Sequence, residues 1–374
     1  MPGSADATGL RGRGVEGERR PGRRAAVARW LRVAAWGLLP ILVVFLLTAC
    51  TSNDPQDTLD VRSDFNQKIF NLYALVFWMA AGVFIVVEGI LLYSLIRFRR
   101  RPGDGLPPQI HGNNKLEIVW TVIPVILLII VAVPTLKTII ETERVPAPGP
   151  NVVQIHVTGH QWWWEVQYPD YKITTANDIV VPEGKVASFT LTSGDVQHSF
   201  WIPKMGGKMD VLPTRTNHMS FTPQDIGEYW GQCVELCGTS HANMRTRLIV
   251  MKQADFDNWV KQQQAAPAQP TTDQEKAGEQ LFMRSACIGC HTINGTNAKG
   301  VAGPNLTHVG SRDVIAAGVL QNTPENMAKW ISDPAAIKPG INPNDRKGYF
   351  MPAFKDQLTP GQIDQIVAYL QSLK

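Results

Sequence analysis

The chain has 374 residues, of which 36 are Lys or Arg, 32 are Asp or Glu and 5 are Cys. This length exceeds that of one typical domain and favours two or three units. The formal net charge of only +4 gives no indication of a nucleic-acid partner. The charge is unevenly distributed, because a group of arginines precedes an apolar run at residues 33–49 (Arg11, Arg13, Arg19, Arg20, Arg23, Arg24, Arg29 and Arg32). A basic segment followed by a short apolar one predicts an export signal over residues 1–49.

The end of that apolar run reads Leu47-Thr48-Ala49-Cys50, which resembles the lipobox of bacterial lipoproteins. The resemblance implies that residues 1–49 are removed and that Cys50 becomes a lipidated N-terminus. The alternative is a chance cysteine at the end of an uncleaved helix. The other four cysteines form two close pairs, which in an exported protein fit disulfides and equally fit a metal site or a haem.

Two further apolar stretches, at residues 69–96 and about 116–140, reach the ~20 residues that a bilayer-spanning helix needs. Glu88 interrupts the first stretch, and Pro124 lies inside the second. The loop between them is basic and is therefore expected on the cytoplasmic side (Arg97, Arg99, Arg100, Arg101 and Lys115). Residues 50–145 are thus predicted to form a transmembrane hairpin whose ends both face outward. A carboxylate inside a span is costly unless it is paired or protonated, so we expect Glu88 to face a partner subunit.

The composition changes after a Pro/Gly-rich linker at residues 145–150. Short runs of Val, Ile, Thr and Phe alternate with turn residues as far as about residue 252, which predicts a β-sandwich or β-barrel domain over residues 146–261. Residues 262–272, rich in Gln, Ala and Pro, look like a flexible spacer. Helical segments at 273–284, 324–331 and 360–373 predict a small all-α domain over residues 273–374. Thr359 as N-cap and Pro360 in the first turn mark the start of the last helix.

One short loop of the β region gathers two thiols, Cys233 and Cys237, followed by His241 and Met244. Sulfur ligands with imidazole select copper over hard cations, although zinc also accepts Cys and His. Two thiolates four residues apart have the chemistry to bridge two copper ions, and the second ion then needs a further histidine. His198 is the candidate for that histidine. A disulfide between the two cysteines is the alternative.

Together with the His198 segment and the sequence GHQWWW at residues 159–164, this loop is similar to subunit II of cytochrome c oxidases, over about residues 67–259. The resemblance implies a cupredoxin-like β-barrel that carries the dinuclear copper centre CuA. The implied ligands are two bridging thiolates, two terminal imidazoles, a weak thioether and a backbone carbonyl (Cys233 and Cys237; His198 and His241; Met244; Glu235). The Glu235 side chain is implied to hold a Mg²⁺ or Mn²⁺ ion shared with subunit I. A copper chaperone is excluded, because such proteins have a thioredoxin-like fold and one span and lack the Met244 spacing.

The same resemblance gives roles to two other residues. Successive strand residues point to opposite faces, so at least one of Trp162, Trp163 and Trp164 is expected to be exposed. The resemblance implies that electrons enter the copper centre at Trp162, with simple core packing as the alternative. It also implies that Glu117, at the cytoplasmic end of the second span, lies at the entrance of a proton channel into subunit I. The alternative for Glu117 is an interfacial carboxylate without a role.

Residues 287–291 read C-I-G-C-H, the attachment signature of c-type haem. Cys287 and Cys290 are predicted to form the thioethers, and His291 is predicted to lie under the iron. The sequence GPNL at residues 303–306 resembles the loop of class I cytochromes c, in which the proline carbonyl orients the ligating histidine. Met351 is the predicted sixth ligand, because methionine opposite histidine raises the haem potential. Three other residues compete for that position (His308, Met327 and Met283).

These features predict subunit II of a respiratory cytochrome c oxidase, multi-pass in a bacterial cell membrane, with the copper and haem domains on the outer face. Electrons from an external cytochrome or a quinol-oxidising cytochrome complex would pass through haem c and CuA to subunit I, where oxygen is reduced and protons are translocated. Subunit III is a further expected partner, and nucleic acid is not. The alternatives are the small subunit of a CuA-containing nitric oxide reductase and a stand-alone membrane-bound electron carrier.

Overall fold

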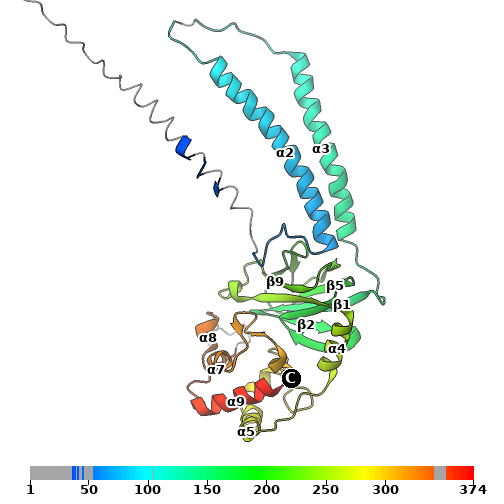
Figure 1. The fold of residues 1–374 in the computed structure, drawn as a ribbon, viewed down its shortest axis with the longest axis vertical. Coiled ribbons are helices and arrows are strands. Elements are labelled where there is room, and N and C mark those ends of the chain that lie inside the picture. Colours follow the sequence, from blue (N-terminus) through cyan, green and yellow to red (C-terminus); the bar gives the residue numbers. More distant parts are fainter. Residues whose placement is uncertain (1–35, 39, 42–43, 46–53, 104, 341–350) are drawn as a thin grey trace, which may run out of the picture. The chain divides into compact units, whose positions relative to one another are not determined.

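The computed structural model describes residues 36–38, 40–41, 44–45, 54–103, 105–340 and 351–374. Contacts between residues divide the chain into two units, 1–54 and 55–374. The predicted lipid-attachment residue, Cys50, lies outside the described residues, so its modification stays a prediction. Within the second unit a helical hairpin, a β domain and a helical domain follow one another along the chain (Figure 1).

Two long apolar helices, α2 (Asp64–Arg97) and α3 (Asn114–Thr142), form the predicted hairpin. Both have the length and hydropathy of a membrane span. The Ser63 side chain caps α2 by accepting a hydrogen bond from a backbone N–H of the first turn. Near the start of α2, the Lys68 Nζ lies 3.3 Å from the Oε2 of Glu141, which is near the end of α3. Most large apolar side chains of both helices are exposed, which is the pattern of helices that contact lipid or other subunits.

In the fully described range 152–251, ten strands form two five-stranded sheets that curl into a sandwich (Figure 1). The strand orders are β3-β2-β1-β5-β8 and β4-β10-β9-β6-β7. Pairing is antiparallel except between β1 and β5 and between β4 and β10. The elements are β1 (Val152–His160), β2 (Trp163–Tyr168), η1 (Pro169–Tyr171), β3 (Ile173–Ala176), β4 (Asp178–Pro182), β5 (Val186–Ser193), β6 (His198–Trp201), β7 (Met209–Val211), β8 (Asn217–Phe221), β9 (Gly227–Cys233), η2 (His241–Asn243) and β10 (Arg245–Met251).

Alternation of buried and more exposed residues along these strands builds the core of the β domain. Every second residue of β2 is buried, and large apolar side chains fill the space between the sheets (Trp164, Tyr168, Phe189, Phe200 and Phe221). Helix α4 (Gln253–Gln264) packs Phe256 and Val260 on this core. This helix is absent from the sequence-based prediction, which begins the spacer at residue 262. The spacing of Phe256, Trp259 and Val260 by three and four residues places them on one helix face.

The C-terminal region is helical, as predicted, and has its own apolar core. The Thr359 side chain caps the last helix and forms a capping box with Gln362, so the predicted N-cap is confirmed. Thr272 and Glu275 form the same box at the start of the first helix. The elements are α5 (Asp273–Arg284), α6 (Cys287–Cys290), η3 (Val309–Ser311), β11 (Val314–Ile315), β12 (Leu320–Gln321), α7 (Pro324–Ser332), α8 (Pro334–Ile337) and α9 (Pro360–Ser372).

Candidate metal centre and C-x-x-C-H cavity

The β domain brings the predicted metal ligands together from two segments. β9 ends at Cys233, and the loop after it carries Cys237 and then His241 at the start of η2. His198 opens β6, which pairs with β9. Within the described residues, the ligand atoms of His198, Cys233 and Cys237 lie within 4.8 Å of one another, and all three residues are buried.

The two thiols of this cluster face each other with an imidazole beyond each. Cys233 Sγ and Cys237 Sγ are 3.7 Å apart and both cysteines are free, whereas a disulfide needs about 2.05 Å. Cys233 Sγ lies 3.8 Å from His198 Nδ1, and Cys237 Sγ lies 3.6 Å from His241 Nδ1. The arrangement is therefore a sulfur pair with a nitrogen donor at each outer end.

Two weaker donors complete the cluster. Met244 Sδ lies 3.9 Å from Cys237 Sγ, and the backbone carbonyl oxygen of Glu235 lies 3.3 Å from Cys233 Sγ. Met244 is fully buried, and both cysteines are 3% exposed. All six predicted donors thus meet in one place, with the sulfur atoms buried and His241 and Glu235 half-buried at its edge.

Asp195 has no role in the sequence-based prediction, yet it fixes the His198 ring. Its Oδ1 lies 2.8 Å from His198 Nε2, so Nδ1 is the nitrogen that faces Cys233. Burial by itself raises the pKa of Asp195, but hydrogen bonds from His198 and from the backbone N–H groups of Gln161 and Val196 outweigh it, and the pKa is lowered. Burial by itself lowers the pKa of His198, but Asp195 and Cys233 outweigh it, and the pKa is raised. Such a hydrogen bond orients a metal-ligating histidine.

The two thiols perturb each other's pKa. The contact with Cys237 lowers the pKa of Cys233, with further support from His198, and the same contact together with burial raises the pKa of Cys237. A lowered thiol pKa favours the thiolate, which is the form that binds metal.

Close backbone packing holds the His198 ring from a third side. A Cβ at Gly159 would lie 2.8 Å from His198 Cδ2 and 3.2 Å from Trp164 Cζ3. The Trp164 and His198 rings also meet edge to face, with centroids 5.8 Å apart. Residue 159 is therefore a glycine because any side chain there would displace the ring.

The C-x-x-C-H segment lies at the wall of a cavity in the C-terminal domain. Helix α6 places the half-buried thiols of Cys287 and Cys290 one turn apart, and His291 follows. His291 Nδ1 lies 2.8 Å from the Pro304 carbonyl oxygen, as the loop at residues 303–306 predicts, so Nε2 is the nitrogen left for a ligand. Burial lowers the pKa of His291 in spite of this contact, which favours the neutral, ligating form. A Cβ at Gly303 would lie 2.8 Å from His291 Cε1.

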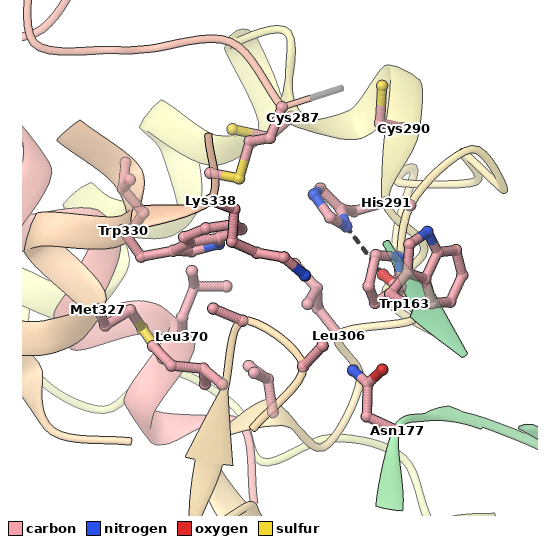
Figure 2. Close-up of a pocket in the computed structure, with 18 of the residues that line it drawn as sticks. Trp163, Asn177, Cys287, Cys290, His291, Leu306, Met327, Trp330, Lys338 and Leu370 are labelled. Atoms are coloured by element: carbon pink, nitrogen blue, oxygen red, sulfur yellow. Dashed lines mark hydrogen bonds between the residues drawn. The ribbon is translucent and has the colours of Figure 1, made fainter. Parts of the chain in front are cut away.

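The cavity is walled mainly by apolar side chains (Figure 2). Met351, the predicted sixth ligand, lines it together with Cys287, Cys290 and His291. Met327, one of the three competitors, also lines it. The other two, His308 and Met283, do not line the described part of the cavity. Met351 and Met327 therefore remain as the two candidates for the sixth ligand.

The expectation that a tryptophan of residues 162–164 is exposed is wrong. Trp164 is fully buried, Trp162 is 9% exposed and Trp163 is half-buried. Trp164 fills the sandwich core, whereas Trp162 and Trp163 line the cavity, so the C-terminal domain covers them. Trp162 Nε1 donates to the Cys237 carbonyl oxygen at 3.3 Å, and Gln161 Nε2 donates to the same oxygen at 2.6 Å. Trp162 therefore touches the cavity and the metal-ligand loop at once.

Two cationic side chains without a sequence-predicted role also line the cavity, Lys338 and Arg312. Lys338 is 4% exposed and its Nζ donates to the Trp162 carbonyl oxygen. Burial lowers the pKa of Lys338 to about 7, although the Cys237 sulfur opposes this effect. Arg312 Nη2 lies 3.4 Å from Thr175 Oγ1 in the β domain, and burial lowers the pKa of Arg312. These contacts cross between domains, so no local sequence pattern indicates them.

Glu117 and Glu88, the two carboxylates that the sequence analysis singles out, lie on the helices of the hairpin. Glu117 is exposed in the first turn of α3, and Glu88 is half-buried within α2. The predicted role of Glu117 and the expected contact of Glu88 with a partner both concern another subunit and stay predictions.

Comparison with known families gives three matches along the chain. Residues 58–138 match the family described as cytochrome c oxidase subunit II, transmembrane domain, and residues 172–253 match its periplasmic domain. Residues 275–374 match the cytochrome c family. The three matches follow the order of the hairpin, the β domain and the helical domain.

Similar proteins cover most of the chain. Cytochrome c oxidase subunit 2 of Alkalihalophilus pseudofirmus is 40% identical over 349 residues, which are 92% of this chain and 98% of that protein. The protein of the same name from Bacillus sp. (strain PS3) is 42% identical over 294 residues, 74% of this chain and 80% of that protein. The solved periplasmic domain of subunit II of the Bradyrhizobium japonicum cytochrome oxidase is 34% identical and covers 32% of this chain and 96% of its own, with a TM-score of 0.31.

Proposed function

The chain belongs to the cytochrome c oxidase subunit II family and ends in a cytochrome c domain, and we propose that it passes electrons from an external donor, through a haem c and a CuA centre of its own, to subunit I. The observation that supports this route is the position of Trp162, which lines the cavity of the C-x-x-C-H segment and donates to a carbonyl of the copper-ligand loop. Oxygen reduction and proton translocation then belong to subunit I.

The donor set of the β domain fits two copper ions better than one zinc. A structural zinc takes four ligands, and this site offers six. In the proposal Cys233 and Cys237 would hold both ions as bridging thiolates, His198 and His241 would be the terminal ligands, and Met244 and the Glu235 carbonyl would be weak donors. Soft sulfur with imidazole is the ligand type that copper favours.

The C-terminal cavity fits a covalently attached haem. Two thiols one helical turn apart would supply the attachment, and His291, whose Nδ1 contacts the Pro304 carbonyl oxygen, leaves Nε2 for the iron. Met351 is the proposed sixth ligand. When bound, the haem and the copper pair each take up and release single electrons, and a methionine-ligated haem has a high potential.

The residues of this chain then form the connection between the two centres. Trp162 contributes its indole N–H to the Cys237 carbonyl and its ring to the cavity wall. Gln161 donates to the same carbonyl and keeps this part of the ligand loop in place. We assign to Trp162 the transfer of electrons into the copper centre.

The remaining roles involve partners. We assign the Glu235 side chain to a Mg²⁺ or Mn²⁺ ion shared with subunit I, and Glu117 to the entrance of a proton channel in that subunit. Export of the chain and lipidation of Cys50 place the copper and haem domains on the outer face of a bacterial membrane, with subunit III as a further partner.

The proposal is tested on the purified complex with a pair of matched variants. The wild type is expected to show a mixed-valence copper EPR signal and covalently bound haem c. Trp162→Phe removes the indole N–H that reaches the ligand loop and is expected to slow electron transfer to copper while both spectra persist. Trp163→Phe is the control, because Trp163 lines the cavity and stacks on His160 instead. Equal rates in the two variants would exclude the Trp162 route.

A further inference from the structure

The C-terminal domain contacts the β domain through two separate segments. In the first, residues 312–318, the Asp313 Oδ2 lies 3.4 Å from Arg247 Nη2 of β10. A Cβ at Gly318 would lie 2.8 Å from Trp230 Cζ3 of β9, so the turn between β11 and β12 packs directly on that ring. Residues 314–317 of the same segment line the haem cavity. The segment therefore joins the cavity wall to the surface of the β domain.

The β domain holds its half of this contact rigidly. Arg247 is 3% exposed and makes two bonds to the Asp178 carboxylate, at 3.0 and 2.9 Å. Its third bond goes to Glu228 at 3.0 Å, and its guanidinium lies 5.7 Å from the centroid of the Trp230 ring. Asp313 thus meets a cation that is already fixed, although its own side chain is 69% exposed and the ion pair adds little by itself.

The second segment, residues 338–340, lies on the copper-ligand loop. Lys338 Nζ donates to the Trp162 carbonyl oxygen. The fully buried Ser240, which lies between the ligands Cys237 and His241, donates from its Oγ to the Pro339 carbonyl oxygen at 2.6 Å. Figure 2 shows the Lys338 side chain lying within the cavity, between Trp330 and His291.

We propose that these two contacts fix the cytochrome domain on the copper domain throughout turnover, and that Lys338 is the residue that positions the haem cavity against Trp162. The inference rests on the proposed function. Contacts of two segments with two separate patches define one orientation, whereas a single contact leaves a pivot. A flexible tether alone would only raise the effective concentration of one domain near the other. Burying an ammonium group is costly unless it gains hydrogen bonds, and within the described residues the hydrogen bond of Lys338 goes to the backbone of Trp162.

A fixed junction has a kinetic consequence. Electron transfer from haem c to copper requires no search by a moving domain, so its rate does not depend on screening of the charges on the two surfaces. The copper domain also covers one wall of the haem cavity through Trp162, Trp163 and Asn177, so an external donor delivers electrons from another side.

The test injects one electron into the intact oxidase complex with a photoexcited reductant and follows the haem c and copper bands. The wild-type rate constant is expected to stay constant within about twofold from about 10 mM to about 1 M ionic strength, over which the Debye length falls from about 30 to about 3 Å. Lys338→Met is expected to slow the step about tenfold, equivalent to about 1.4 kcal/mol in the barrier. Lys338→Arg is expected to retain most of the rate, and Lys329→Met, at an exposed position of α7, to retain all of it.

A measurement of the haem c potential distinguishes a loss of positioning from a loss of charge in the Lys338→Met variant. Loss of a cation in the cavity lowers that potential, because a positive charge favours ferrous iron, and a lower potential would speed transfer to copper. Slower transfer in Lys338→Met in spite of a lower potential therefore indicates lost positioning. If that variant does not accumulate, Gly318→Ala decides, because its Cβ would push the turn off the Trp230 ring, and the rate should then become dependent on ionic strength.

Two results would overturn the inference: a wild-type rate that changes strongly with ionic strength or viscosity, or a Lys338→Met rate equal to that of the wild type. Covalent haem and the mixed-valence EPR signal are measured first in every preparation. A wild type that lacks either centre contradicts the proposed function, whereas a wild type that contains both and shows a mobile domain contradicts only the fixed junction.

Discussion

The two proposed redox sites of this chain are built in different ways. In the β domain, the contacts of the cluster join six donors at distances from 3.3 to 3.9 Å, and β-strands, a short loop and Asp195 hold them. In the C-terminal region, Cys287, Cys290 and His291 lie on one wall of a cavity to which the β domain also contributes. A metal ion needs rigidly held ligands because it accepts only a small range of coordination geometries. A planar cofactor held by two covalent bonds brings its own shape and needs an apolar cavity.

Because the two sites are built separately, we expect a substitution in one site to remove that centre alone. This is the largest effect that we expect. Cys233→Ser removes a proposed bridging thiolate, so the mixed-valence EPR signal should disappear, copper content should fall, and turnover should drop by about 100-fold or more, equivalent to about 2.7 kcal/mol in the barrier. Covalent haem should be unchanged. Cys287→Ser is the reciprocal control, with weakened haem attachment and a normal copper signal. A variant that lost both centres at once would contradict independent construction.

Asp195→Asn tests whether the copper cage depends on support from outside the ligand set. The amide keeps the size of the side chain but loses the charge that holds His198 Nε2. Copper affinity should fall by about 10–100-fold, the usual cost of losing such a partner. Competition with a copper chelator measures this affinity, and Asp210→Asn at a partly exposed position of β7 serves as the control. Unchanged affinity in Asp195→Asn would mean that packing against Gly159 and Trp164 is enough to orient the ring.

Met351→His tests the cavity side of the comparison. Covalent haem should persist, because Cys287 and Cys290 provide the attachment. The haem potential should fall, because a thioether is a weaker donor than imidazole and favours ferrous iron. Turnover with a high-potential donor should decrease, and turnover with an artificial donor that feeds copper directly should hardly change.

A redox titration of the full chain in its complex measures the Met351→His shift. Met327→Leu is the parallel variant, because Met327 also lines the cavity. If Met351→His leaves the potential and the ligand-field spectrum unchanged while Met327→Leu alters both, the sixth ligand is Met327.

Cys50→Ala should have the smallest effect. Mature wild-type protein is expected to begin at an acylated Cys50, which mass spectrometry of the N-terminus detects. The variant should lose the acyl chains and remain in the membrane, because two spans exceed a lipid anchor in strength. An unmodified N-terminus upstream of Cys50 in the wild type would refute the lipobox interpretation.

The order of the domains and most donors of the proposed copper site are visible in the sequence, because the loop from Cys233 to Met244 is short and its residue types are specific. The hairpin is equally visible from its two apolar runs. Helix α4 is missed because its Gln-rich end resembles a spacer, although Phe256, Trp259 and Val260 have helical spacing. The buried state of Trp162 depends on a domain more than a hundred residues away in the chain, which strand alternation does not describe. Lys338 is missed for the same reason, since its partner is a backbone carbonyl of the other domain.

The central claim, that electrons pass from haem c to the copper centre within this chain, is tested most directly by the order of reduction in the intact complex. With oxygen excluded and less than one equivalent of donor added, haem c should be reduced first. It should then be reoxidised with the same rate constant at which the mixed-valence copper signal decreases. Reduction of copper before haem c, or haem c that stays reduced while copper remains oxidised, would contradict the account.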